Sequence, residues 1–124
     1  MSTHNAALVA AVVAAAERDG SASHGLLRLD GYIATLRSGW VDGRAVPIVT
    51  RPAPSILAVD AAGGFAQVAL AAVRDQAIAT ARSQGLVAVC IAGSHHFERL
   101  AAGLAKAGTG GCPEDIGRDK RILK

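Results

Sequence analysis

Residues 56–93 read ILAVDAAGGFAQVALAAVRDQAIATARSQGLVAVCIAG, which is two short apolar runs separated by a long alanine-rich one. The outer runs, 56–60 and 86–93, have the length and the apolar content of buried strands. The central run, 65–85, is rich in helix formers and ends at a glycine, the residue that most often follows a last helical turn. A strand, a helical crossover and a parallel strand form a βαβ unit, so we expect an α/β fold.

Two helices are expected upstream of this unit. Residues 5–18 consist mainly of strong helix formers, and Gly20 is placed to end the first helix. A second helix is expected over about 24–38, with Ser21 or Ser23 as its N-cap. The leucines and the isoleucine of this run would supply its apolar side.

The segments outside these elements differ in composition. VDGRAVPIVTRPAPS, residues 41–55, contains three of the four prolines and has no helical period, so we expect an extended crossing segment there. Downstream, all three lysines fall within residues 98–124. A further helix is expected at about 98–107, with loose order beyond it. The expected division is an N-terminal helical segment at 1–40, a βαβ part at 41–97 and a divergent tail at 98–124.

The bulk composition favours one small core and excludes several functions. The chain has 124 residues, of which 51% are hydrophobic and only 3% aromatic, so aliphatic side chains must fill the core. A net charge of +3 is too mild to indicate a nucleic-acid partner. The apolar run 6–16 is too short to span a membrane and is preceded by no lysine or arginine, which predicts a cytoplasmic protein. Cys90 lies in an expected strand and is predicted to be buried, and no disulfide or metal site is expected.

One stretch carries residues suited to chemistry, SHGLLRLDGY at 23–32. On a continuous helix His24, Arg28 and Tyr32 would lie in one row, because four residues make slightly more than one turn. Arg28 can bind a carboxylate in a fork, His24 can move a proton near neutral pH, and Ser23 can orient its imidazole. The spacing alone favours the plainer alternative, a capped helix with ordinary surface residues.

Three further patterns are weaker. His95 and His96 follow the second strand, where ligands collect in α/β sheets, but adjacent strand residues face opposite sides and do not chelate one metal. A histidine with ordinary loop partners is the plainer alternative. The DAAGG run at 60–64 lacks the spacing of a dinucleotide fingerprint and indicates a tight turn. The end GRDKRILK, 117–124, contains an aspartate and no aromatic residue, which favours a solvated tail over nucleic-acid or membrane binding.

Two segments together resemble the N-terminal part of the malate/L-lactate dehydrogenase family, which comprises NAD(P)-dependent oxidoreductases. These are SHGLLRLDGYIATLRSGWVDGRAVP at 23–47 and VDAAGGFAQVALAAVRDQAIATARSQGLVAVCIAGSHHF at 59–97. The resemblance covers about residues 7–97 and rests on S-H-G-x-x-R-x-x-x-Y followed, in order, by H-H-F. It implies a 2-hydroxy or 2-oxo acid or a cyclic imino acid as substrate, NAD or NADP as cofactor, and a homodimer.

The resemblance also implies roles for individual residues. Ser23 and His24 match the relay serine and the proton-donating histidine, and Arg28 matches the arginine that holds the substrate carboxylate. Tyr32 would lie in the same pocket wall. His96 matches a histidine at the nicotinamide that is the catalytic base in some members. The cofactor would contact one continuous run, His96, Phe97, Glu98, Arg99 and Leu100.

The match ends after Phe97, where Glu98 takes the place of the family's usual small residue. Nothing in the tail resembles the strands that supply most of the family's cofactor site. We therefore expect a truncated member with an incomplete fold and no turnover of its own. The alternative is a non-catalytic module that self-associates through an exposed sheet edge.

Overall fold

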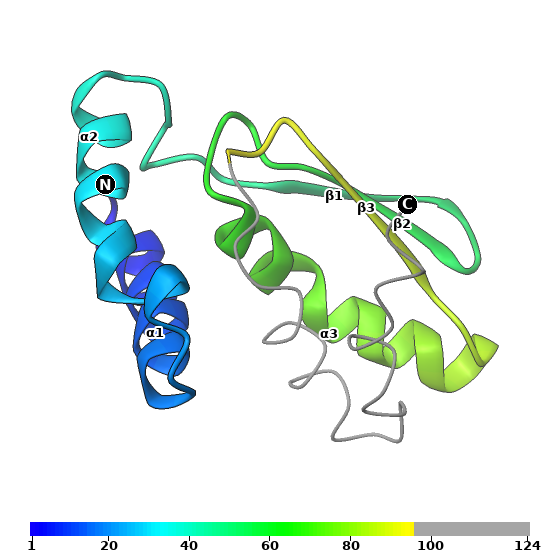
Figure 1. Cartoon of the computed structure of the whole chain (residues 1–124). Coiled ribbons are helices and arrows are strands. Elements are labelled where there is room, and N and C mark those ends of the chain that lie inside the picture. Colours follow the sequence, from blue (N-terminus) through cyan, green and yellow to red (C-terminus); the bar gives the residue numbers. More distant parts are fainter. Residues whose placement is uncertain (96–124) are drawn as a thin grey trace, which may run out of the picture.

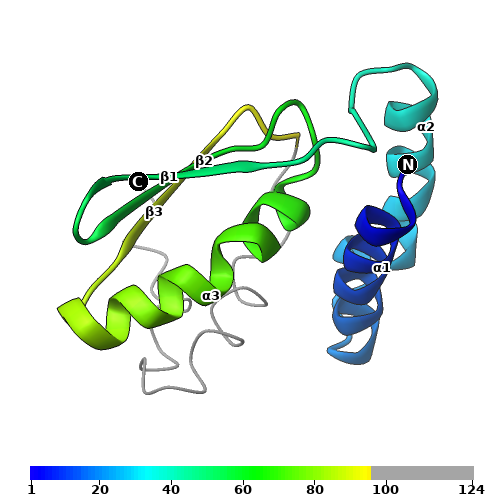
Figure 2. The same ribbon diagram turned by 180° about the vertical axis from the view of Figure 1, so that it is seen from behind.

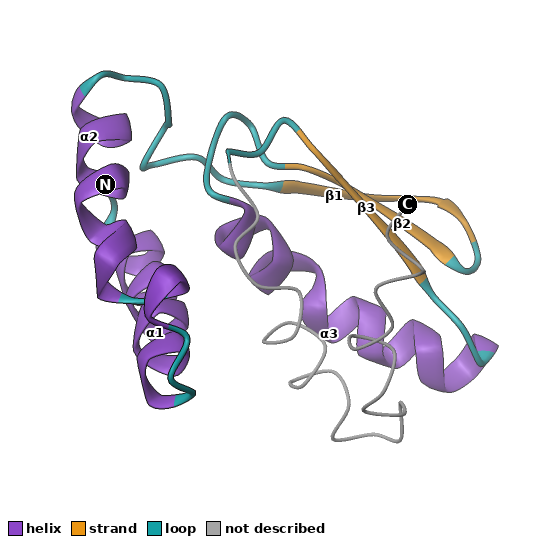
Figure 3. Cartoon of the chain, in the orientation of Figure 1, coloured by secondary structure: helices purple, strands orange, loops and turns teal. Residues whose placement is uncertain are grey.

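The computed structural model describes residues 1–95, in which two N-terminal helices lie at one end and a sheet with one helix lies at the other (Figure 1; Figure 3). The elements in chain order are α1 (Thr3–Arg18), the 3-10 turns η1 (Ala22–His24) and η2 (Leu26–Arg28), α2 (Leu29–Arg37), β1 (Ile48–Ala53), β2 (Ile56–Asp60), α3 (Ala66–Gln84) and β3 (Ala88–Ala92). The helix expected at 98–107 and the rest of the tail lie outside the described residues.

The predicted βαβ unit is confirmed. β2 and β3 pair in parallel, from Ile56 opposite Ala88 to Asp60 opposite Ala92. The connecting helix α3 ends at Gly85, whose φ of 79° is the left-handed value that glycine adopts without strain. α3 covers one face of the sheet, and in both views no described helix covers the other face (Figure 2).

The side chains between α3 and the sheet form an aliphatic core, as the low aromatic content requires. Its fully buried members are Leu57, Val59, Ala61, Ala69 and Val73. They come from β2, the turn after it and one stripe of α3. This packing fixes the carboxyl ends of β2 and β3 relative to the start of α3.

The extended crossing segment expected at 41–55 contains a strand that the sequence did not predict. β1 lies within it and pairs antiparallel with β2, which gives a three-stranded sheet in the order β1-β2-β3. Pro52 is tolerated because β1 is an edge strand and because its register shifts between Thr50 and Ala53. The unit is therefore ββαβ.

The N-terminal helix packs through one stripe, Val9, Val13 and Ala16, and exposes its other side. Ser2 caps it by accepting from the backbone N–H of Asn5 at 3.2 Å. Asn5 is itself buried, and its Nδ2 donates to the carbonyls of residues 43 and 45, at 3.1 Å each. The start of α1 is thereby tied to the loop that leads into β1.

The second predicted helix begins later than expected. α2 starts at Leu29, and the preceding residues form two short 3-10 turns separated by Gly25. The backbone N–H of Leu26 donates at 2.6 Å to the carboxylate of Glu17, which belongs to α1. His24 and Tyr32 are therefore not carried by one continuous helix, and the predicted row along 24–32 is broken.

The prediction that Cys90 is buried is wrong. The thiol is exposed, because β3 is the outer strand of the described sheet and residues 88, 90 and 92 face away from α3. No helix among residues 1–95 is long and apolar enough to cross a membrane.

Candidate functional site

Ser23 and His24 lie in the 3-10 turn between α1 and α2. The Oγ atom of Ser23 is 3.0 Å from Nδ1 of His24, and the Oγ atom of Ser21 is 3.4 Å from the same nitrogen. Neither serine caps α2, which begins without a side-chain cap. Both hydroxyls instead flank one nitrogen of the half-buried imidazole, which fixes the orientation of the ring.

Arg28 is held against the same turn. Its Nε atom donates to the backbone carbonyl of Ser23 at 3.0 Å, and the residue is exposed. The guanidinium is thus anchored next to His24 although the two residues do not share a helix. A cation and an oriented imidazole on one short turn are the groups that bind a carboxylate and move a proton.

This turn requires glycine at position 25, because there is no room for a side chain there. A Cβ on Gly25 would collide with the carboxylate of Glu17, the group that caps Leu26. We expect Gly25→Ala to lower the free energy of unfolding by about 1–3 kcal/mol, through overpacking and the lost cap. Urea denaturation followed by circular dichroism measures the change.

Gly31→Ala is the matched control, since a Cβ there meets nothing within 4 Å and the residue lies inside α2. That variant should be about 0.5–1 kcal/mol more stable, because alanine is the better helix former. Equal stability of the two variants would contradict the assigned role of Gly25.

Tyr32 lies deeper than the turn. It is 6% exposed, its ring packs edge-on against Phe65 at 5.2 Å between centroids, and its hydroxyl accepts from Nε2 of Gln67 at 3.1 Å. Phe65 is also 6.4 Å from the ring of His95. The aromatic contacts join the N-terminal helices to the carboxyl end of the sheet.

The position of His95 is set by its backbone. Its N–H donates to the carbonyl of Gly64 at 2.9 Å, and its carbonyl accepts from Ala66 N–H at 3.4 Å, as a parallel bridge opposite Phe65. The strand β3 is thereby continued past Ala92 along the turn that starts α3. His95 emerges at the carboxyl end of the sheet, as expected from the sequence.

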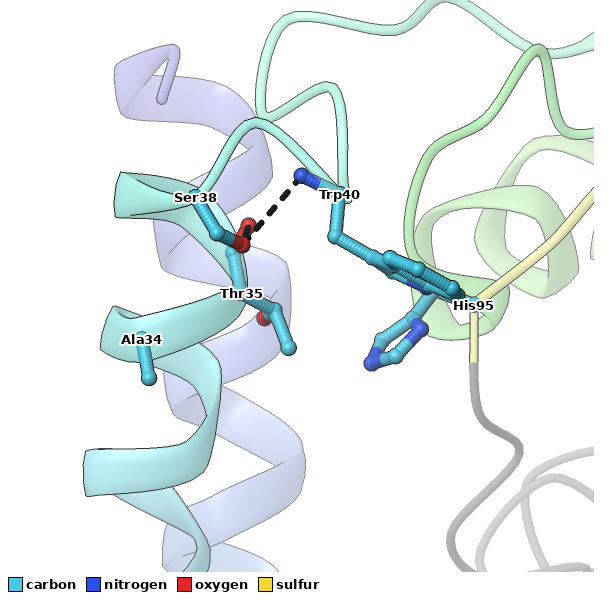
Figure 4. Close-up of a pocket in the computed structure, with 5 residues that line it drawn as sticks. All are labelled: Ala34, Thr35, Ser38, Trp40 and His95. Carbon is cyan, nitrogen blue, oxygen red and sulfur yellow. Dashed lines mark hydrogen bonds between the residues drawn. The ribbon is translucent and has the colours of Figure 1, made fainter.

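An open groove of about 320 Å³ lies between the end of α2 and His95 (Figure 4). Its lining residues are Ala34, Thr35, Ser38, Trp40 and His95. The hydroxyls of Thr35 and Ser38 donate to backbone carbonyls within the helix, at 2.9 and 3.1 Å. Trp40, 75% exposed, points toward His95. With its hydroxyls engaged, the groove offers mainly apolar surface, which suits a flat ring.

The glycine turn at 60–64 is used internally, in agreement with the tight turn predicted from its sequence. Ala62 and Gly63 have positive φ values of 51° and 74°. The N–H of Gly63 donates to Gly93 O, and that of Gly64 donates to Ala61 O, both at 2.9 Å. These N–H groups just before α3 therefore already donate to backbone carbonyls of the fold. Within residues 1–95, no cluster of three histidine, cysteine or acidic residues is arranged to hold a metal ion.

The structure thus brings Ser23, His24 and Arg28 together, whereas Tyr32 lies in the core against Phe65 and Gln67. His96, Phe97, Glu98, Arg99 and Leu100 lie outside the described residues, and their roles stay predictions. The sequence reasoning did not single out Trp40 or Gln67. Trp40 carried a usable signal, since it is the chain's one tryptophan and follows a helix stop at Gly39.

Comparison with known proteins identifies the sequence family. The profile described as malate/L-lactate dehydrogenase matches residues 1–112. A Δ1-pyrroline-2-carboxylate/Δ1-piperideine-2-carboxylate reductase of Pseudomonas putida is 55% identical over 87 residues, covering 70% of this chain and 26% of that protein. A (2R)-3-sulfolactate dehydrogenase (NADP(+)) of Chromohalobacter salexigens is 54% identical over 82 residues, covering 66% of this chain and 24% of that protein.

Solved structures agree with this match. The Δ1-piperideine-2-carboxylate reductase of Pseudomonas syringae pv. tomato superposes with a TM-score of 0.80 and 48% identity, over 83% of this chain and 31% of that one. A malate dehydrogenase of Pyrococcus horikoshii superposes with a TM-score of 0.75 and 28% identity, over 83% of this chain and 30% of that one. The chain spans only about a quarter to a third of the length of these relatives.

Proposed function

The chain belongs to the malate/L-lactate dehydrogenase family, and we propose that it is the substrate-binding N-terminal region of an NAD(P)-dependent reductase of cyclic imino acids or 2-oxo acids. The observation that carries the proposal is the hydrogen-bonded turn that holds Ser23, His24 and Arg28 together. The named activities of the relatives support the substrate class, since each concerns a small carboxylate.

Arg28 binds the substrate carboxylate. Its guanidinium is exposed and is anchored through Nε, and an anchored fork loses less freedom on binding than a mobile side chain. A carboxylate held there brings the neighbouring carbonyl or imine carbon of a small 2-oxo or cyclic imino acid toward His24.

His24 donates the proton. The ring that donates is protonated on both nitrogens, so Nδ1–H donates to a serine hydroxyl, and Ser23 makes the shorter of the two serine contacts to Nδ1. Nε2–H gives its proton to the oxygen or nitrogen of the substrate on which negative charge develops, and the ring becomes neutral. Ser23 accepts from Nδ1–H and so keeps the ring oriented during this transfer.

The described residues fit one part of a nicotinamide cofactor. The groove beside Trp40 and His95 is apolar, open and large enough for a single flat ring. His95 directly precedes in sequence the run 96–100 that the family resemblance assigns to the cofactor. When bound, NADH or NADPH supplies the hydride. We propose that Trp40 and His95 hold one ring of it; the homodimer implied by the resemblance stays a prediction.

A chimera tests this function without asking the short chain to supply a whole enzyme. Residues 1–95 replace the matching segment of the Pseudomonas putida reductase, and NADH and NADPH oxidation is followed with Δ1-piperideine-2-carboxylate and with pyruvate. We expect turnover with one of these substrates. His24→Gln in the chimera should lower kcat by about 10²–10⁴-fold, the usual contribution of a positioned general acid.

Arg37→Gln serves as the matched control in the same chimera, since Arg37 is exposed at the far end of α2. A folded chimera that binds the cofactor but turns over neither substrate, or one that His24→Gln leaves unchanged, would contradict the proposed function. The 124-residue chain assayed alone is expected to show no turnover.

A further inference from the structure

Two serine hydroxyls lie at the same nitrogen of His24, and only one of them has a role so far. The Oγ atom of Ser23 is 3.0 Å from Nδ1, and the Oγ atom of Ser21 is 3.4 Å from it. The family resemblance assigns a role to Ser23 and none to Ser21. Ser23 is exposed, however, whereas Ser21 is half-buried. Water therefore competes more easily for the place of the Ser23 hydroxyl than for that of Ser21.

The backbone of Ser21 is fixed on both sides. Its N–H donates to Ala16 O at 2.9 Å, and its carbonyl accepts from the N–H of His24 at 2.9 Å. Gly20, with a φ of 70°, makes the left-handed turn after α1, and its N–H donates to Glu17 O at 3.0 Å. Between this fixed backbone and the hydroxyl, χ1 is the single torsion left to choose. Ser21 is thus a short link from the end of α1 to the imidazole.

The same end of α1 also holds the chain on the other side of His24. The carboxylate of Glu17 accepts from the backbone N–H of Leu26 at 2.6 Å. Residues two positions before and one position after Gly25, at which a Cβ would collide with Glu17, are therefore bonded to the end of α1 or to Ser21 beside it. These bonds set the place of His24 relative to α1 without using Arg28.

The support of Ser23 is different. Its backbone carbonyl accepts from Nε of Arg28 at 3.0 Å, so Ser23 is tied to the group that holds the substrate carboxylate in the proposed function. Ser21 is tied to α1 instead. The two hydroxyls at Nδ1 consequently rest on separate parts of the structure, and the loss of one leaves the support of the other intact.

We propose that Ser21 is a second positioning residue for His24, which shares Nδ1–H with Ser23 and takes the whole hydrogen bond when the Ser23 hydroxyl is missing. The proposal rests on the proposed function, in which Nε2 of His24 gives the proton. The charged ring has one N–H on this side, and such a donor can be shared between two acceptors in a three-centre bond. A ring held through Nδ1 keeps Nε2 directed at the substrate. Ser21 acts through the ring and not on the substrate.

Ring order in the 124-residue chain tests the positioning without any turnover. The histidines are labelled with 13C, the His24 signals are identified as those that His24→Gln removes, and relaxation of the ring C–H bonds gives the order parameter. We expect Ser21→Ala and Ser23→Ala each to leave the ring ordered, and the double variant to lower the order parameter into the flexible range, below about 0.6. Ser83→Ala is the matched control, since its exposed hydroxyl donates to Thr80 O at 3.1 Å, away from the turn.

Turnover of the chimera described above measures the effect on the reaction. Each single variant should lower kcat by at most about threefold, and the double variant by about 10- to 100-fold, more than the product of the two. KM should change by less than about twofold, because Arg28 is untouched. If adding Ser21→Ala to Ser23→Ala changes neither ring order nor kcat, or loosens the ring without lowering kcat, the proposal is overturned. His24→Gln separates this failure from that of the proposed function, since it still lowers kcat when only the role of Ser21 is wrong.

Discussion

Phe65→Ala is expected to lower the free energy of unfolding by about 3–5 kcal/mol, the cost typical of removing a fully buried phenylalanine. The side chain is 1% exposed and packs between Tyr32 and His95. Its loss leaves a cavity where the N-terminal helices meet the sheet. Urea denaturation, followed by circular dichroism, measures the effect.

Two variants calibrate this result. Phe65→Leu keeps most of the volume and should cost less than Phe65→Ala, while Leu86→Ala removes a side chain that is 71% exposed and should change stability by less than about 0.5 kcal/mol. If Phe65→Ala costs no more than Leu86→Ala, Phe65 does not join the two parts of the structure.

Arg28→Ala is expected to weaken binding of Δ1-piperideine-2-carboxylate to the 124-residue chain by about 10- to 100-fold. A hydrogen bond to a charged group contributes about 1.5–3 kcal/mol, and each 1.4 kcal/mol is a factor of ten in affinity. Calorimetry without NADH or NADPH measures binding alone, because no hydride source is present.

Arg28→Lys should recover only part of the affinity, since an ammonium does not reproduce the fork. Arg37→Ala removes an exposed arginine nine residues further along the chain and leaves the turn intact. If Arg37→Ala weakens binding as much as Arg28→Ala does, the effect is one of net charge, and Arg28 is not the carboxylate site.

Elements with a strong local signal could be predicted from the sequence. The strand at 56–60 and the helix that ends at Gly85 were found nearly at their observed bounds. Both combine a regular apolar pattern with a clear stop signal, and the core between them uses that same pattern. Local preference and tertiary packing agree there.

Elements that depend on distant partners could not be predicted. Pro52 in β1 argues against a strand unless it lies on an edge beside a register shift, and only the pairing with β2 reveals that shift. The break before α2 arises because Glu17, from α1, caps Leu26. Cys90 was expected to be buried because an apolar strand usually is, but β3 is an edge in the described sheet.

The sequence predicted that Ser23, His24 and Arg28 lie near one another, but it predicted the wrong local backbone for them, and their roles stay predictions. Ser23, His24 and Arg28 do lie together, but through a hydrogen-bonded turn and not through a helical row. Helical spacing gave the right neighbours because a 3-10 turn also folds residues back within a few positions. The groove at Trp40 could not be predicted from the sequence, because one of its sides comes from the end of α2 and the other from His95, beyond β3.

The most direct test of the account is to locate the bound carboxylate. Amide chemical shifts of the 124-residue chain are recorded during titration with Δ1-piperideine-2-carboxylate, without NADH or NADPH. We expect the largest changes within residues 23–28, around the oriented His24 and the anchored Arg28. Shifts confined to other regions, such as the groove at Trp40 and His95, or no shifts at all, would show that the turn is not the substrate site.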